Sequence, residues 1–314
     1  MRTGRASALT DTGRRRPHNE DTFVCEPPLF AVADGVGGAQ AGEIASRLAA
    51  ATLEERIAGA LGEGTLATLI LEANNRIYTR ALDDSDAAGM GTVVTALLVD
   101  EAAGTVAIGH VGDSRAYRIR DERLEQLTPD HSLVGELVRA GRLSTEEAEQ
   151  HPHRSVITRA VGTEPVVDVH TETLSTVPGD LYLICSDGLT DLVRDEQILE
   201  LIVAAEDDPE TAVHSLVDAA NSAGGIDNIT VVLFEVIDGD PLPPDAEPTP
   251  GEPDADTAEH AVEVEAQAES RPLADSAVPV HRHGAGAGGR WLALFAILLT
   301  IAIAALVIWW SLKR

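Results

Sequence analysis

The sequence predicts an α+β fold in which helices cover antiparallel sheets. Strand-like runs rich in Val, Ile and Leu follow one another over short links and are bounded by Gly, Asp or Pro. Segments with a helical period come in pairs between these groups of strands. The strict alternation of strand and helix that is typical of parallel sheets is not seen. The pattern therefore favours strands that are neighbours in a sheet, with helices outside.

The expected elements are short apolar runs for the strands and segments with one apolar face for the helices. Ser144 and Glu147 form the capping-box pattern that starts a short helix. The expected strands are residues 30–33, 92–99, 106–111, 116–120, 166–171, 181–185 and 230–236. The expected helices are residues 41–60, 66–82, 133–140, 195–204 and 209–223.

The composition limits what can fill the core and what the chain can bind. Hydrophobic residues make up 44% of the 314 residues and aromatic residues only 3%, so Ala, Val, Leu and Ile must build the core. The formal net charge is −29. Because nucleic-acid backbones are bound by Lys and Arg, this charge argues against a nucleic-acid partner. A phosphorylated substrate would need local positive charge to bind to such an acidic protein.

Five short acidic motifs each place an Asp beside a Gly or Asn at the edge of an apolar run. A strand end holds the carboxylate rigidly, and the glycine lets a cation approach the backbone. An ordinary Asp-Gly turn explains any one of them. Several from distant parts of the chain instead suggest a shared centre for two metal ions. The motifs are RPHNED (residues 16–21), ADGVGG (33–38), VGDSR (111–115), SDGL (186–189) and GGIDNIT (224–230).

The first motif combines two acids with an arginine. Glu20 and Asp21 are adjacent, so in a strand their side chains would point to opposite faces and one could reach the metal centre. Arg16 can bind two phosphate oxygens in a fork, which suits a phosphoryl group. The alternatives are a solvated pair of acids and an exposed basic cluster at residues 14–16.

Taken in order, these motifs resemble those of the metal-dependent protein phosphatases, the protein phosphatase 2C family, in its bacterial form. The resemblance includes GMGTVVTALL (residues 89–98) and the longer forms VGDSRAY and SDGLTD, and it spans residues 8–237. Each motif is short, but six in this order with family-like spacing are highly specific. The resemblance implies a four-layer α-β-β-α sandwich of two antiparallel sheets that pack face to face, with helix pairs outside.

The resemblance also implies a site for two Mn²⁺ or Mg²⁺ ions at one end of the sandwich. Asp34 matches the carboxylate that bridges both ions, and the carbonyl of Gly35 matches a ligand of one of them. Asp187 and Asp227 match the ligands that complete the other ion. Arg16 matches the phosphate-binding arginine, and with Asp34 and Asp187 it makes up the expected catalytic residues.

The remaining members of the site follow from the same resemblance. Glu20 and Asp21 match acids that hold metal-bound waters, and Asn228 matches a supporting polar residue. Asp113 matches a ligand of a third, weaker metal ion, whose site would share Asp187. Two divalent ions lower the pKa of a bridging water and stabilise the attacking and departing oxygens. The expected reaction is direct attack of this water on phosphoserine or phosphothreonine.

One position departs from the pattern of some family members, which carry a histidine proposed as the leaving-group acid. Here that position is Val36, as in bacterial relatives. A metal-bound water or another histidine would then supply the proton. His151 and His153 lie in the variable segment 128–155, which helps to select substrate in this family; exposed loop histidines are the alternative. His110 is expected to be structural.

The composition changes sharply after residue 237. Residues 238–289 are dominated by Pro, Glu, Asp, Ala and Gly, which predicts a disordered linker, with a second small domain as the alternative. Residues 291–310 carry no charge and match the roughly 20 residues that cross a bilayer. Tryptophans at both ends and flanking basic residues are typical of a membrane span rather than a buried helix. The expected parts are a catalytic domain (1–237), the linker, and a transmembrane helix with a short tail (290–314).

The sequence therefore predicts a membrane-tethered serine/threonine protein phosphatase that acts on phosphorylated proteins and opposes Ser/Thr protein kinases. The first residues lack the apolar stretch of a signal peptide, so the catalytic domain is expected in the cytoplasm, attached to the cytoplasmic membrane. One alternative is a phosphatase specialised for a partner that regulates a sigma factor. Another is a non-catalytic metal-binding scaffold, which would be indicated by degenerate ligands.

Overall fold

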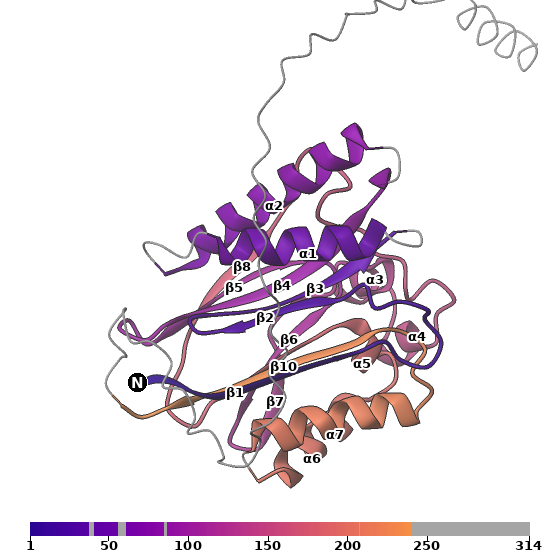
Figure 1. The fold of residues 1–314 in the computed structure, drawn as a ribbon. Coiled ribbons are helices and arrows are strands. Elements are labelled where there is room, and N and C mark those ends of the chain that lie inside the picture. Colours follow the sequence, from indigo (N-terminus) through magenta and orange to yellow (C-terminus); the bar gives the residue numbers. More distant parts are fainter. Residues whose placement is uncertain (38–40, 56–60, 85–86, 207, 240–314) are drawn as a thin grey trace, which may run out of the picture. The chain divides into compact units, whose positions relative to one another are not determined.

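The residues that the structure describes form a sandwich of four layers. The structure is a computed structural model, and it describes residues 1–37, 41–55, 61–84, 87–206 and 208–239. Two antiparallel sheets pack face to face, and helices cover the outer face of each sheet (Figure 1). The predicted α+β class and the α-β-β-α layer order are confirmed for these residues.

Each sheet has five strands, and neighbouring strands in both sheets are antiparallel. The first sheet has the order β1 (Arg2–Asp11), β10 (Ile229–Ile237), β9 (Leu181–Cys185), β6 (Arg115–Arg120) and β7 (Arg123–Gln126). The second sheet has the order β2 (Thr22–Glu26), β3 (Leu29–Val36), β4 (Gly91–Asp100), β5 (Thr105–Val111) and β8 (His170–Ser175).

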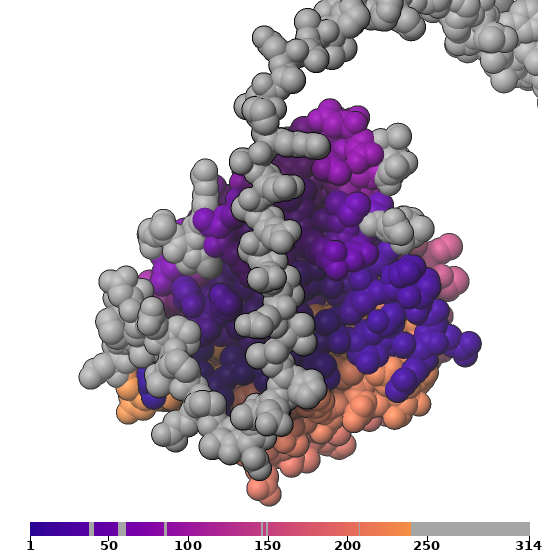
Figure 2. Space-filling view, in the orientation of Figure 1, coloured from indigo at the N-terminus to yellow at the C-terminus, as the bar shows by residue number. Residues whose placement is uncertain are grey.

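Two helix pairs form the outer layers. Helices α1 (Ala41–Glu54) and α2 (Glu63–Asp83) cover the second sheet, and α6 (Asp195–Ala204) and α7 (Pro209–Ser222) cover the first. In the space-filling view the purple surface of α1 and α2 and the orange surface of α6 and α7 lie on opposite sides of the indigo N-terminal segments (Figure 2). The shorter helices are α3 (Leu133–Arg139), α4 (Thr145–Glu149) and α5 (Asp187–Thr190).

Three helices, α3, α4 and α7, start with a side-chain cap. Ser144 and Glu147 form a complete capping box at the start of α4, as the sequence predicts. Ser132 caps α3 by accepting a hydrogen bond from the backbone N–H of Gly135. Helix α7 starts with proline at its first position, where the missing N–H costs nothing, and Asp208 caps it.

The few aromatic side chains are concentrated between the two sheets. Phe30 stacks on Phe234 with ring centroids 3.9 Å apart, and Tyr182, which pairs with Phe234 across the strands, stacks on it at 5.2 Å. All three are fully buried. The interface between α1 and the second sheet is lined instead by small residues such as Ala45 and Ala49. The predicted Ala, Val, Leu and Ile core therefore holds for the outer interfaces, and aromatic pairs fill the wider central one.

Strand ends bring the acidic motifs to one end of the sandwich. In the second sheet, the last residues of β3 and β5 pair with the same part of β4. In the first sheet, Cys185 at the end of β9 pairs with Val231 near the start of β10. The two sheets are joined at this end, where the backbone N–H of Glu20 donates to Oδ1 of Asn228 at 2.8 Å.

Some expected elements differ from those observed. Strands β1, β2 and β7 and the short helix α5 were not predicted, and the run at 166–171 is mostly loop, because the strand β8 begins at His170. Val166 is 74% exposed, so its apolar character does not place it in the core. The strand β8 is a polar edge strand that pairs with β5 alone.

The predicted linker and membrane segment lie outside the described residues, apart from the first two positions of the linker. Residues 240–314 are not described, so the expectations for 238–289 and 290–314, including the span 291–310, are not tested. Within the part of the chain that is described, no helix is long and apolar enough to cross a membrane.

Candidate metal centre

Five of the predicted aspartates come together at one end of the sandwich. Asp34 interacts electrostatically with Asp21, Asp187, Asp113 and Asp227, which are far apart in the sequence. They come from the ends of β3, β5 and β9 and from the segments just before β2 and β10. The structure therefore brings together the five aspartates that were predicted from the sequence to share a site.

Backbone contacts hold Asp34 and Gly35 at the end of β3. The hydroxyl of Thr92 on the neighbouring strand donates to the carbonyl of Asp34 at 2.6 Å. A Cβ at Gly35 would lie 2.5 Å from the carbonyl group of Gly42 and 2.7 Å from the carbonyl oxygen of Glu20. No other side chain fits here, because the start of α1 and the segment before β2 both pack against this turn.

The second Asp-Gly pair, Asp187-Gly188, opens a short helix rather than a simple turn. Asp187 is the first residue of α5, directly after Ser186 at the end of β9. A Cβ at Gly188 would lie 1.9 Å from the carbonyl oxygen of Asn228. The glycine therefore lets α5 pack directly on the segment that carries the last acidic motif, and this holds Asp187 beside Asp227.

Asp21 is held by two hydroxyl groups from the opposite sheet. Its Oδ2 accepts hydrogen bonds from Ser186 Oγ at 2.9 Å and Thr230 Oγ1 at 2.6 Å. Its Oδ1 is buried and has no hydrogen-bond partner among the described residues. A buried carboxylate oxygen without a partner is costly, so this atom is a candidate ligand for a cation or a cation-bound water.

The expectation that Glu20 and Asp21 lie in a strand is wrong. Both residues precede β2, which begins at Thr22, and both are buried, with exposures of 9% and 8%. The reason is that Ser46 of α1 donates to the backbone carbonyl of Glu20 at 2.6 Å, which fixes an irregular segment under the helix. Both acids thus face the interior, and a solvated charge pair is excluded for Asp21 and Glu20 alike.

Asn228 joins three segments through its side-chain amide. Its Oδ1 accepts from the backbone of Glu20, and its Nδ2 donates to the carbonyls of Thr12 at 3.0 Å and His18 at 2.9 Å. Asn228 is buried, with 4% of its surface exposed. Asn228 therefore fixes the loop between β1 and β2, which carries Arg16, against the start of β10.

Replacing Asn228 with Ala is expected to lower the free energy of unfolding by about 2 to 4 kcal/mol, because it leaves the buried N–H of Glu20 and the part-buried carbonyls of Thr12 and His18 without this partner. Urea denaturation of the full chain measures the effect. The control is Asn75→Ala on the exposed face of α2, which should stay within about 0.5 kcal/mol of the wild type. Equal stability of the two variants would contradict the anchoring role.

Burial and mutual repulsion make the carboxyl groups harder to ionise. Burial, followed by the effect of neighbouring acids, raises the pKa of Asp34 and of Asp187 well above the usual range. Burial raises the pKa of Asp21 to about 6, although the hydroxyls that donate to it act in the opposite direction. Burial and Asp130 raise the pKa of Asp113 to about 7. Such a cluster favours a partner that brings positive charge.

Arg16 is the cationic side chain predicted at this site, and the structure places it beside one of the acids. Its Nη2 lies 2.7 Å from Oδ2 of Asp227 in an ion pair, and the Arg16 side chain is 48% exposed. The hydrogen bond to Asp227 is the main effect that raises the pKa of Arg16. The guanidinium thus lies at the solvent side of the carboxylate cluster, where an incoming anion would meet it.

The donor set suits a hard divalent cation. Carboxylate and carbonyl oxygens are the preferred ligands of Mg²⁺, and Mn²⁺ accepts the same oxygens. The unpartnered Oδ1 of Asp21 and the raised pKa values of Asp34 and Asp187 fit a site that positive charge would stabilise. Among the described residues, however, no three His, Cys, Asp or Glu side chains are arranged closely enough to hold a metal ion as they stand. Ligation would require small movements of the carboxylates toward a common ion.

The structure shows the surroundings of the three histidines considered in the sequence analysis. His110 is fully buried, as expected of a structural residue, with Thr95 and Pro129 as hydrogen-bond partners. His151 and His153 lie in the turn after α4 and are half-buried and exposed, respectively.

The sequence analysis missed the hydroxyl groups that donate hydrogen bonds to the site. The only signal for them in the sequence was a polar residue at the edge or start of an apolar strand. They are Thr92, Ser186 and Thr230.

A four-layer sandwich with aspartates gathered at one end is the architecture expected for the phosphatases that the motifs resemble. A family model described as protein phosphatase 2C matches residues 18–219. The chain belongs to the protein phosphatase 2C family.

Named relatives are bacterial serine/threonine phosphatases. PstP of Mycobacterium tuberculosis is 41% identical over 241 residues, which cover 75% of this chain but 46% of PstP, so the chain matches about half of that relative. The serine/threonine phosphatase stp of Listeria innocua is 39% identical over 242 residues, which cover 73% of this chain and 95% of stp. The crystal structure of the PstP catalytic domain in complex with two manganese ions superposes with a TM-score of 0.68 at 37% identity, over 74% of this chain and 98% of that one.

Proposed function

We propose that this protein is a metal-dependent serine/threonine protein phosphatase that removes phosphate from phosphoserine and phosphothreonine in proteins. The observation that carries the proposal is the convergence of five aspartates from separate segments at one end of the sandwich. The proposal is supported by membership of the protein phosphatase 2C family and by relatives that are named serine/threonine phosphatases.

The proposed cofactor is a pair of Mn²⁺ or Mg²⁺ ions, with a third, weaker ion beside them. Asp34, the carbonyl of Gly35, Asp187 and Asp227 would hold the pair, and Asp113 with Asp187 would hold the third. When bound, the ions supply positive charge for the phosphoryl oxygens and activate a water for attack. The manganese ions of the PstP structure support this assignment.

The side chains around the ligands orient them. Ser186 and Thr230 fix one oxygen of Asp21 and leave the other directed into the cluster, where it would hold a metal-bound water. Glu20 would act in the same way from the adjacent position, and Asn228 would support both acids through the backbone of Glu20. These contacts join the two sheets and fix Asp21 and the backbone of Glu20 before substrate binds.

Arg16 is proposed to bind the substrate phosphate. Its guanidinium is already paired with Asp227, so a cation bound by Asp227 would release it toward an incoming phosphoryl group. Arg16→Ala is expected to raise the KM for a phosphothreonine peptide by roughly tenfold or more, with a smaller change in kcat. Steady-state kinetics should show no such change for Arg15→Ala, the exposed neighbour. An unchanged KM for Arg16→Ala would remove this residue from the phosphate site.

The proposed function is tested by hydrolysis assays on the full chain. The substrates are p-nitrophenyl phosphate and matched phosphothreonine and phosphotyrosine peptides, each with Mn²⁺, with Mg²⁺, and with chelator. We expect hydrolysis only with a divalent cation, and faster hydrolysis of the phosphothreonine peptide than of the phosphotyrosine peptide. Activity that survives chelation, or a preference for phosphotyrosine, would overturn the proposal.

The proposal extends to the organisation and location of the chain. Residues 1–237 form the catalytic domain, 238–289 a flexible acidic linker, and 291–310 a single membrane span within the segment 290–314. The uncharged run with tryptophans at both ends supports the span. The tether would keep the catalytic domain on the cytoplasmic side, at high effective concentration near membrane-bound Ser/Thr kinases and their substrates.

The membrane tether predicts where the protein is found after cell fractionation. The full chain should remain in the membrane pellet after an alkaline carbonate wash, because a transmembrane helix is not released by loss of charge interactions. A variant that ends at residue 289 should move to the supernatant and keep its activity. Release of the full chain by the wash would contradict the span.

A further inference from the structure

Two threonines that face each other across β1 and β10 connect the carboxylate of Asp21 to a residue outside the aspartate cluster. Thr10 pairs with Thr230 in the register of these strands, and their hydroxyl oxygens lie 2.7 Å apart. Oγ1 of Thr230 donates to Oδ2 of Asp21 at 2.6 Å. At the other end, Nδ2 of Asn19 donates to Oγ1 of Thr10 at 2.8 Å. We name this continuous series of hydrogen bonds, from Asn19 through Thr10 and Thr230 to Asp21, the threonine row.

The protons of the threonine row all point toward Asp21. An amide nitrogen only donates, a carboxylate only accepts, and a hydroxyl has one proton to give. Because Thr230 gives its proton to the carboxylate, Thr10 must donate to Thr230, and the nitrogen of Asn19 donates to Thr10. The amide of Asn19 cannot be turned around, since its Oδ1 accepts the backbone N–H of Asp21 at 3.1 Å. The direction of the row is therefore set by Asn19.

The threonine row leaves the two oxygens of Asp21 with different surroundings. Oδ2 accepts from Thr230 and from Oγ of Ser186, which in turn accepts the backbone N–H of Thr230 at 3.0 Å. Oδ1 is buried and has no hydrogen-bond partner among the described residues. Hydroxyl dipoles that are aligned in this way strengthen one another. The row thus holds the carboxylate by one oxygen and keeps the other free.

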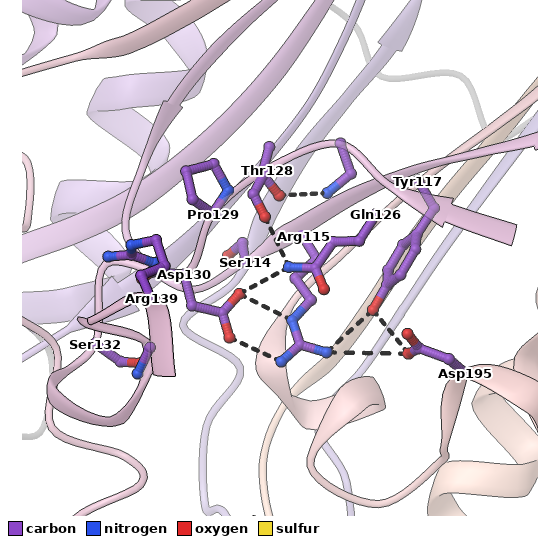
Figure 3. Close-up of polar contacts among 12 residues, drawn as sticks. Ser114, Arg115, Tyr117, Gln126, Thr128, Pro129, Asp130, Ser132, Arg139 and Asp195 are labelled. Carbon is purple, nitrogen blue, oxygen red and sulfur yellow. Dashed lines mark hydrogen bonds and ion pairs between the residues drawn. The ribbon is translucent and has the colours of Figure 1, made fainter. Parts of the chain in front are cut away.

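Other acids in this domain are held by arginine instead. Nε and Nη2 of Arg115 donate to both oxygens of Asp130 at 2.9 and 2.7 Å, and Nη1 of Arg115 lies 4.0 Å from Oδ1 of Asp195 (Figure 3). Within the part of the chain that the structure describes, Asp21 has no ion pair, and hydroxyl groups donate to it. The orientation of Asp21 therefore depends on the threonine row more than a carboxylate in a forked ion pair would.

We propose that Thr10 and Asn19 are positioning residues that act through Thr230 to orient the carboxylate of Asp21 toward a cation-bound water. The inference rests on the proposed function, in which Asp21 holds such a water. Neither residue is among the proposed metal ligands. Loss of a group that orients a metal site from behind its ligands typically weakens metal binding by roughly 10- to 100-fold. The test is therefore the affinity for Mn²⁺, measured on the full chain from the electron paramagnetic resonance signal of free Mn²⁺, which requires no turnover.

Asn19→Asp reverses the threonine row while it keeps the shape of the side chain and an acceptor for the N–H of Asp21. The new carboxylate takes the proton of Thr10, so Thr10 can accept from Thr230, and Asp21 loses a donor. We expect the Kd for Mn²⁺ to rise by roughly tenfold. The added negative charge alone would have the opposite effect, since it attracts a cation. The sign of the change thus separates the row from simple electrostatics.

Thr10→Val interrupts the row at its middle, and Thr10→Ser is the conservative variant. Valine leaves Thr230 without its donor and Asn19 without its acceptor, so the Kd for Mn²⁺ should again rise by roughly tenfold. Serine keeps the hydroxyl and should restore the affinity of the wild type. The matched control is Thr3→Val near the other end of β1, where the hydroxyl is buried but has no hydrogen-bond partner among the described residues. This control should bind Mn²⁺ like the wild type.

The double variant tests whether Asn19 acts through Thr10. In the Thr10→Val background, Asn19→Asp has no route to Thr230, so it should not weaken Mn²⁺ binding further. The inference is overturned if the two effects multiply, if Asn19→Asp alone tightens binding, if Thr10→Ser fails to restore it, or if Thr3→Val weakens it equally. A wild type that binds no Mn²⁺ would overturn the inference and the proposed function together. A wild type that binds Mn²⁺ but does not hydrolyse phosphopeptides would count against the proposed function alone.

Discussion

Asp34→Asn abolishes phosphatase turnover, with an expected loss in kcat of at least about 10³-fold, comparable to the loss of a major charge-stabilising group in other active sites. The expectation follows from the position of Asp34 at the centre of the cluster, where it interacts with Asp21, Asp187, Asp113 and Asp227. The amide keeps the shape of the side chain but cannot bridge two cations as a carboxylate does. Asp187→Asn is expected to behave in the same way. The measurement is kcat on p-nitrophenyl phosphate at saturating Mn²⁺.

The fold of this variant should survive and even gain stability in chelator, because the substitution removes one of several repelling buried carboxylates. Circular dichroism and thermal unfolding distinguish this outcome from simple misfolding. The matched control is Asp218→Asn on the exposed face of α7, which should keep full activity. Half of the wild-type activity in Asp34→Asn would refute the proposed role of Asp34 as a bridging ligand.

The sequence predicts the central strands of this fold well because these buried strands consist of uninterrupted apolar residues. The strand β4 is buried along almost its entire length, and β9 was predicted with its observed bounds. The strands that were missed lie at sheet edges, where one face is exposed and polar residues are tolerated. β1 begins with Arg2 and has a single buried residue, Thr3, with the other positions half-buried or exposed, so its sequence resembles a loop. β1 forms a strand because it pairs with β10, which its own sequence does not indicate.

The displaced strand has a similar explanation. The run at 166–171 contains three valines, but Val166 points into solvent and the chain forms its strand four residues later in the polar sequence His170–Ser175. Pairing with β5 fixes this register, since the backbone of an edge strand must be satisfied on one side regardless of side-chain polarity. Local hydrophobicity cannot reveal a choice that depends on a distant neighbour.

In the candidate site, too, the residues with a local sequence signal could be predicted, and those that depend on distant contacts could not. The aspartates could be found from the sequence because each stands beside a glycine or asparagine at a strand end, which is local information. The groups that orient them could not be found, because Ser186 and Thr230 reach Asp21 across more than 160 positions of sequence. The strand expected at Glu20 and Asp21 was predicted wrongly because α1 packs on this segment, which has an irregular backbone.

The stability of the cation-free protein is expected to fall as the pH rises from 6.5 to 8. A carboxyl group whose pKa is raised in the folded state binds its proton more tightly when folded, so folding loses free energy as that proton dissociates. Burial raises the pKa of Asp113 to about 7, so this group loses its proton within the window, and the raised pKa values of Asp34 and Asp187 act on stability with the same sign. A group with a raised pKa contributes up to about 1.4 kcal/mol per pH unit below its folded pKa, so Asp113 alone gives a loss of roughly 1 kcal/mol across the window.

Two buried histidines set the lower limit of the pH range in which stability is expected to fall. Burial lowers the pKa of His110 to about 3 and that of His131 to about 4, so both stay neutral in the folded protein while unfolded histidine becomes charged below about 6.5. Their effect opposes that of the carboxyls below this pH and vanishes above it. Calorimetric unfolding of the full chain in chelator should therefore show a falling Tm between pH 6.5 and 8, and saturating Mn²⁺ should remove the decline by neutralising the carboxylates. A Tm that rises across this window in chelator, or a decline that Mn²⁺ does not remove, would show that the aspartate cluster is not the group of charges that a cation stabilises.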